Sequence, residues 1–142
     1  MQDVSPAIKF IFNLAKVQSL LTRRFDGGLG GLGFNEFMIL YHLNLAPGGK
    51  LRRIDLAGKV GLTASGITRL LLPMEKIGLV SKQVNPKDAR VSLVLLAPGG
   101  KMKLEEAIEN AEMLAREIIP QQRAGSIKEL TDTLTDISGT IY

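Results

Sequence analysis

The chain has 142 residues, a formal net charge of +4 and 45% hydrophobic residues, with one His and no Cys. This length and apolar fraction suit one folded domain and exclude a largely disordered chain. The lack of Cys excludes disulfides, thiol nucleophiles and Cys-based zinc sites, and a single His excludes a multi-histidine metal centre. No apolar run reaches the roughly 18–20 residues that span a bilayer, and Lys9 and Lys16 interrupt the apolar N-terminal stretch, which argues against a secretory signal. We therefore expect a soluble, cytoplasmic protein with no metal, no cofactor and no membrane partner.

The basic residues are concentrated in the middle of the chain. Residues 50–103 carry eleven basic and three acidic side chains, a sum of +8, whereas residues 1–49 sum to +1 and residues 104–142 sum to −5. One face built to bind a polyanion explains this distribution, and so does a solvated, lysine-rich surface. Charge alone does not choose between the two.

An apolar helix is predicted at the start of the chain. Ser5 is a suitable N-cap and Pro6 a suitable first helical residue, and the apolar residues after them form two stripes. A helix that is apolar on nearly all sides needs cover on more than one side, and a second subunit is the expected cover. The five glycines of residues 27–33 lack the Gly-Lys-Ser/Thr ending of a phosphate-binding loop, so they indicate a flexible connector.

The next segment has the pattern of a helix-turn-helix. Residues 34–45 and 53–60 have helical spacing, and Gly61-Leu62 forms a tight turn before Thr63, which can cap a fourth helix with its hydroxyl. His42 is expected to line the core or a pocket rather than to act in catalysis. The residues of the third helix that are expected to face inward are Ile54, Ala57 and Val60.

The fourth helix is predicted to have one apolar and one polar side. The polar side offers hydroxyls, a guanidinium and an ammonium, which are groups that suit the major groove of DNA. An ordinary solvated helix face is the alternative, although an exposed Leu72 among polar groups favours a surface that covers something. Pro73 predicts a kink or a loosened turn. The expected inward residues are Ile67, Leu70, Leu71, Met74 and Ile77, and the expected outward residues are Ser65, Thr68, Arg69, Leu72 and Lys76.

A β-hairpin is predicted directly after this helix. Residues 80–85 and 90–96 are strand-like, and residues 86–89 supply the turn between them. A hairpin in this position is a wing. Asp88 and Arg90 near its tip can pair, which would hold a guanidinium ready for a narrow minor groove, and a simple ion pair at a turn is the alternative.

Two further helices are predicted at the end of the chain. One runs from after residues 98–100 to Ile119, and the other starts at about Gly125. The last helix has a narrow apolar seam of the kind that pairs with another helix, and we favour a second subunit over an intramolecular partner. The seam consists of Ile127, Leu130, Leu134, Ile137 and Ile141.

The chain resembles the MarR family of winged helix-turn-helix transcriptional regulators. The residues that carry the resemblance are 53–57, 61–71, 74–80 and the Asp88-Ala89-Arg90 wing tip. The resemblance implies a mainly α fold with a small β-hairpin wing, flanked by N- and C-terminal dimerisation helices. It also implies a homodimer whose recognition helices enter adjacent major grooves, and a small aromatic or anionic effector. Three departures are Arg52 and Gly33 in place of hydroxyl helix caps, and Pro73 in the recognition helix.

We therefore predict one regulator domain over residues 1–142, with a winged helix-turn-helix at about 34–100 and a dimerisation region of residues 1–26 and 101–142. The predicted function is that of a ligand-responsive repressor, not an enzyme, that binds double-stranded DNA at a pseudo-palindromic operator. A protein-interaction module and a non-specific DNA architectural protein are the alternatives. No effector-binding residue is assigned. The residues expected to contact DNA are Arg52, Arg53, Lys76 and Lys87 on phosphates, Thr63, Ser65, Thr68 and Arg69 on bases or nearby phosphates, and Arg90 in the minor groove, oriented by Asp88.

Overall fold

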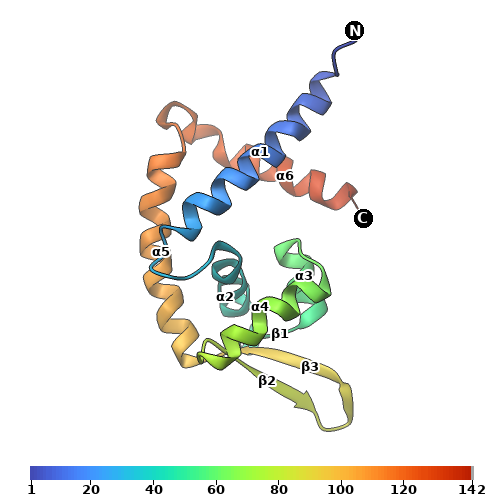
Figure 1. The fold of residues 1–142 in the computed structure, drawn as a ribbon, viewed down its shortest axis with the longest axis vertical. Coiled ribbons are helices and arrows are strands. Elements are labelled where there is room, and N and C mark those ends of the chain that lie inside the picture. Colours follow the sequence, from blue (N-terminus) through green and yellow to red (C-terminus); the bar gives the residue numbers. More distant parts are fainter. Residues whose placement is uncertain (142) are drawn as a thin grey trace. The chain divides into compact units, whose positions relative to one another are not determined.

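The computed structural model describes residues 1–141, except for the side chain of Ala89. The fold is mainly helical with one small sheet, as predicted (Figure 1). In the described part of the chain, no helix is both long and apolar enough to cross a membrane. The elements are α1 (Pro6–Asp26), α2 (Phe34–Leu45), the 3-10 helix η1 (Pro47–Gly49), β1 (Lys50–Arg52), α3 (Arg53–Val60), α4 (Ala64–Lys76), β2 (Val80–Asn85), β3 (Asp88–Leu96), α5 (Pro98–Ile118), the 3-10 helix η2 (Gln121–Ser126) and α6 (Ile127–Thr140).

Two compact units divide the chain. The first, Met1–Ala111, contains α1 to α4, the sheet and most of α5. The second, Glu112–Tyr142, contains the end of α5, η2 and α6. The candidate site described below lies entirely within the first unit.

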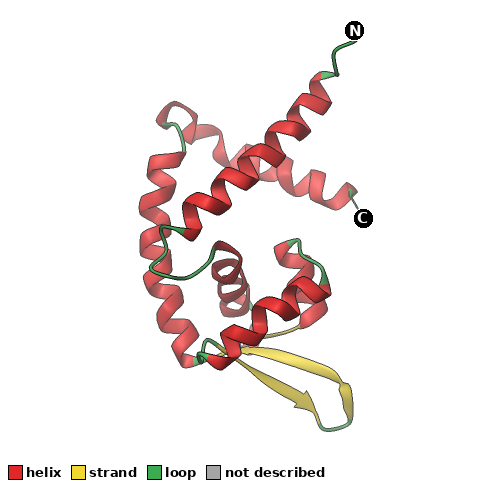
Figure 2. Cartoon of the chain, viewed as in Figure 1, coloured by secondary structure: helices red, strands yellow, loops and turns green. Residues whose placement is uncertain are grey.

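The three strands form an antiparallel sheet in the order β1-β3-β2. The hairpin of β2 and β3 is the predicted wing, and Figure 2 shows it extending beyond the helices that carry it. Pairing of Asn85 with Asp88 starts β3 two residues earlier than predicted, so the turn is reduced to Pro86-Lys87. The sequence analysis missed β1, because three residues are too few to show an alternating pattern, and their pairing with β3 is decided by the tertiary fold.

The inner side of α4 anchors this helix in the core of the first unit. Ile67 and Met74 are fully buried and Leu71 is nearly so, as predicted. Ile77 was expected beside them but is 69% exposed, because α4 ends at Lys76 and Ile77 already has non-helical backbone angles. The helix runs without interruption through Pro73, where a kink or a loosened turn was expected.

The buried side of α3 is only partly the one that was predicted, because Ala57 is buried as expected but Ile54 is not. Leu56 and Ala57 are buried, whereas Ile54, which was expected to face inward, is 61% exposed. Two residues along a helix correspond to more than half a turn, so burial of Leu56 forces Ile54 toward the opposite side. An eight-residue helix contains too few apolar positions for its sequence alone to choose the buried side.

The glycine-rich segment between α1 and α2 is a packed connection and not the flexible connector that was predicted. The Asp26 carboxylate accepts a hydrogen bond from the backbone N–H of Phe34 at 2.6 Å, and Glu36 accepts one from Gly33 at 2.8 Å. Leu29, within the segment, is fully buried. Asp26 and Glu36 thus replace the hydroxyl cap that α2 lacks.

Large apolar side chains remain exposed on α1 and, in the other unit, on α6. Phe12 and Ile11 of α1 are 62% and 59% exposed. On α6, Leu130 and Leu134 are 49% and 45% exposed. Apolar exposure of this extent along a helix is typical of a surface that another chain covers.

Replacement of Gly100 by Ala is expected to destabilise the fold. Gly100 is buried in the first turn of α5, and an added Cβ would collide with the carbonyl oxygen of Leu79 and lie 2.9 Å from the Leu96 side chain. We expect a loss of about 1–3 kcal/mol in the free energy of unfolding, measured by urea denaturation.

Gly58→Ala is the matched control, because a Cβ on this helical glycine would meet nothing within 4 Å. Alanine favours the helix, so this variant should be as stable as the parent chain or more stable. Equal stability of the Gly100→Ala variant and the parent would contradict the close approach of α5 to the hairpin.

Candidate nucleic-acid interface

The turn between α3 and α4 sets where α4 begins. Gly61 ends α3 in the left-handed conformation with φ of 78°, which a glycine adopts without strain. The Thr63 hydroxyl accepts a hydrogen bond from the backbone N–H of Gly66 at 3.0 Å, which confirms the predicted cap. It also lies 3.3 Å from the Ser65 hydroxyl. The first turn of α4 therefore starts at a defined point with two exposed hydroxyls at its end.

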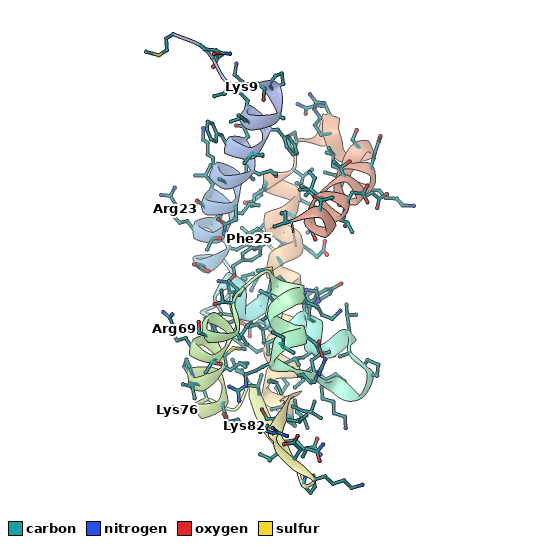
Figure 3. The ribbon with its side chains drawn as sticks, turned by 90° about the vertical axis from the view of Figure 1, so that its right-hand side faces the viewer. Lys9, Arg23, Phe25, Arg69, Lys76 and Lys82 are labelled. Carbon is teal, nitrogen blue, oxygen red and sulfur yellow. The ribbon has the colours of Figure 1, made fainter. Side chains whose placement is uncertain are left out.

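The outer side of α4 is open to solvent. Ser65, Arg69 and Lys76 are exposed, and Leu72 among them is 53% exposed. Figure 3 shows Arg69 and Lys76 along the outer edge of the helix. The predicted division of α4 into a buried apolar side and an exposed polar side is thus confirmed.

Beside the first turns of α4 lies an open groove, here called the outer groove. Its walls come from the end of β1, the start of α3, the start of α4 and the part of β3 near the wing tip. It combines three guanidinium groups with three hydroxyl groups, which is a surface suited to phosphates. The lining residues are Arg52, Arg53, Ile54, Ala64, Ser65, Thr68, Arg90, Val91 and Ser92.

The outer groove brings together half of the residues that the sequence predicted as DNA contacts. They are Arg52, Arg53, Ser65, Thr68 and Arg90. Arg69 lines a separate shallow hollow with Asn35 and Leu62. Thr63, Lys76, Lys87 and Asp88 line neither of these two surfaces. Sequence reasoning missed Ile54, Ala64, Val91 and Ser92 as members of the groove, and the polar Ser92 within an apolar strand was a usable signal.

Arg52, the last residue of β1, is paired with the Asp55 carboxylate in the first turn of α3. Its Nε and Nη2 donate to Asp55 at 2.9 and 3.2 Å. This hydrogen bonding lowers the pKa of Asp55 and raises the pKa of Arg52. The Arg52 side chain is 58% exposed, so its guanidinium keeps N–H groups available for a phosphate.

Arg53 is half-buried and bound within the protein. Its Nη1 donates to the Thr68 hydroxyl at 3.1 Å, and its Nη2 donates to the Ser92 hydroxyl at 3.2 Å. The Thr68 hydroxyl in turn donates to the carbonyl oxygen of Ala64 at 3.0 Å. The hydroxyl of Thr68 is therefore engaged both as an acceptor and as a donor.

The wing tip carries the predicted pair of Asp88 and Arg90. The Arg90 Nε donates to Asp88 Oδ1 at 3.0 Å, and its Nη2 donates to Oδ2 at 3.2 Å. The Arg90 side chain is 91% exposed. Hydrogen bonds from the Arg90 side chain and backbone lower the pKa of Asp88, so the pair persists through neutral pH and is lost only when pH falls below that depressed pKa.

His42 lies half-buried on α2, next to the Tyr41 ring. Burial lowers its pKa, and the charge of Lys59 lowers it further, so the imidazole is neutral at pH 7. Among the described residues, no group of three or more His, Cys, Asp or Glu side chains could hold a metal ion.

A helix-turn-helix with a free second helix, followed by a two-stranded wing, defines the class of winged helix-turn-helix DNA-binding proteins. The model of the MarR family matches residues 34–92. These residues run from the start of α2 into β3 and include the outer groove. This match agrees with the resemblance to the MarR family that the sequence analysis found, and members of that family are transcriptional regulators rather than enzymes.

Similar proteins span nearly the whole chain. The uncharacterized HTH-type transcriptional regulator YdgJ of Bacillus subtilis is 24% identical over 139 residues, which cover 96% of this chain and 82% of YdgJ. The transcriptional regulator BldR of Sulfolobus solfataricus has a similar structure, with a TM-score of 0.85, 26% identity, and coverage of 99% of this chain and 100% of BldR. The MarR family regulator Sco3205 of Streptomyces coelicolor, solved in complex with DNA, has a TM-score of 0.75 at 18% identity, with coverage of 96% and 90%. At 18% identity, the similarity to Sco3205 shows a shared fold and nothing more.

Proposed function

We propose that this chain is a DNA-binding transcriptional regulator of the MarR family, which binds a specific pseudo-palindromic operator as a homodimer and represses transcription in the cytoplasm, in response to a small aromatic or anionic effector. The observation that carries the proposal is the exposed polar side of α4 next to the arginine-lined outer groove. A helix anchored by one side and free on the other fits the major groove of B-DNA. The wing lies on the same surface, so it would reach the neighbouring backbone or minor groove.

The proposed DNA contacts follow from exposure and chemistry. Arg69 offers a forked donor that suits guanine, and Ser65 offers an adaptable hydroxyl. Thr68, whose hydroxyl is engaged, offers its methyl group to thymine. The remaining proposed contacts are Thr63 near a base or phosphate, Arg52, Lys76 and Lys87 on phosphates, and Arg90, oriented by Asp88, in the minor groove.

The homodimer is supported by the exposed apolar residues of α1 and, separately, of α6. Together with most of α5, these helices form the proposed dimerisation region, residues 1–26 and 101–142, and residues 34–100 form the proposed DNA-binding region. Two symmetric recognition helices would bind half-sites about 10 base pairs apart. Repression and the effector rest on the family resemblance.

Selection of bound fragments from a random DNA pool tests this function as a whole. The expected result is an enriched, two-fold symmetric sequence with half-sites about 10 base pairs apart. Binding should weaken steeply with salt, with a log–log slope near −7 if about eight phosphates are neutralised per dimer. Binding without enrichment would indicate an architectural protein, and no salt-dependent binding would indicate a protein-interaction module.

Arg69→Ala is expected to weaken binding to the selected operator more than binding to random DNA, because a base contact is lost only at the correct sequence. Lys76→Ala is the matched control on the same exposed side of α4. A lost phosphate contact should weaken binding to both DNAs alike. Fluorescence anisotropy measures the affinity of each variant for the operator and for random DNA. Equal losses of affinity for the two DNAs in Arg69→Ala would contradict a base contact.

Arg90→Ala is expected to lower operator affinity roughly 5- to 150-fold, because a guanidinium in a narrow minor groove is strongly attracted there. Arg90→Lys keeps the charge but loses the fork that binds Asp88, and should restore affinity only in part. The measurement is a gel-shift titration. Unchanged affinity of the Arg90→Ala variant would show that Arg90 pairs with Asp88 but does not contact DNA.

Leu134→Glu is expected to dissociate the dimer, because it places a charge on the apolar seam of α6. Lys128→Glu introduces the same side chain on the opposite side of the helix and should leave the dimer intact. Sedimentation equilibrium measures the mass of each. A dimeric Leu134→Glu variant would show that this seam does not join subunits.

A further inference from the structure

One arginine connects three elements of the candidate interface. Arg53 is the first residue of α3, Thr68 lies in the second turn of α4, and Ser92 lies in β3. The guanidinium donates through one terminal nitrogen to Thr68 and through the other to Ser92. A planar group with donors in fixed directions suits such a bridge, and an ammonium does not reproduce it.

The bridge lies where apolar packing of the wing ends. Val94 of β3 is 5% exposed and belongs to the core, whereas β2 is exposed from Ser81 to the tip. Side chains two residues apart share one face of a strand, so Ser92 follows Val94 toward the tip on the same face, and Arg90 lines the outer groove together with Ser92. Hydrogen bonding at Ser92 thus extends the attachment of the wing beyond its last buried residue.

The three bridging side chains also separate two hollows. Arg53, Thr68 and Ser92 line the outer groove, and they line a small cavity of about 30 Å³ behind it. This small cavity is also lined by apolar side chains of α4 and of the wing, including Leu71 and Val94. The guanidinium therefore spans a gap between α4 and β3 that other side chains do not fill.

We propose that Arg53 is a positioning residue that holds the wing at a fixed distance from the recognition helix, so that Arg90 and Arg69 reach DNA together. This assignment replaces the phosphate contact that the sequence predicted for Arg53, and it rests on the proposed function. The bridge increases the affinity for the operator relative to random DNA, because only binding to the operator requires the contacts of Arg69 and Arg90 at the same time.

Arg53→Lys and Ser92→Ala are the variants that test this role. Lysine keeps the charge that a phosphate contact needs but loses the bridge, and Ser92→Ala removes one acceptor with a minimal change of volume. Each should weaken operator binding about five- to tenfold, as expected for the loss of one or two hydrogen bonds. Binding to random DNA should change little.

The double variant separates a shared role from two independent ones. If both residues act through one bridge, Arg53→Lys combined with Ser92→Ala binds the operator no more weakly than the weaker single variant. Ser92→Thr keeps the hydroxyl and should restore binding. Arg52→Lys is the matched control, because the adjacent arginine, at the end of β1, donates to Asp55 at the start of α3 and is proposed to contact a phosphate.

Three results of the DNA-binding measurements would overturn the proposal. Near-normal operator binding by Arg53→Lys would favour a phosphate contact of Arg53 instead. Additive losses of affinity in the double variant would show that Arg53 and Ser92 act independently. Equal losses of affinity for operator and random DNA would indicate a general effect on stability. Hydrogen exchange of the wing amides in the free protein gives a readout without DNA. Exchange should be faster in both single variants, and unchanged exchange would refute the bridge even if the parent chain binds no DNA.

Discussion

Burial of the inner side of α4 is the constraint on which the candidate interface depends. Ile67 and Met74 are fully enclosed, and each side chain of this size contributes roughly 1.5–3 kcal/mol when it leaves water. Rotation of the helix would expose them and would bury the charge of Arg69. The helix therefore keeps one orientation, with its polar side outward, and it accommodates Pro73 within that orientation.

The arginines near the outer groove differ in their hydrogen-bond partners, which are carboxylates for two of them and hydroxyls for the third. Asp55 and Asp88 each hold a largely exposed guanidinium through two hydrogen bonds, so Arg52 and Arg90 are oriented but remain in contact with solvent. Arg53 has hydroxyl partners instead and is half-buried. Three arginines close together thus divide into two that face outward and one that connects the recognition helix to the wing.

Much of the architecture was predictable because local signals agree with one another. The bounds of α2 and α3 match the predicted ranges, and the hydroxyl cap at Thr63 begins α4 as expected. Where only one or two turns of pattern were present, prediction failed. Ile54 and Ile77 were placed in the core, β1 was missed, and the loop before α2 was expected to be flexible although Asp26 and Glu36 close it.

The sequence by itself determined that a basic middle segment folds as helix, turn, helix and hairpin, and that one side of α4 is polar. Periodicity and capping act between residues a few positions apart, so they can be recognised without knowledge of the fold. Only the tertiary structure decided that Arg53 meets Thr68 and Ser92. Those residues lie 15 and 39 positions away, and their approach depends on the packing of α3 and α4 against the sheet.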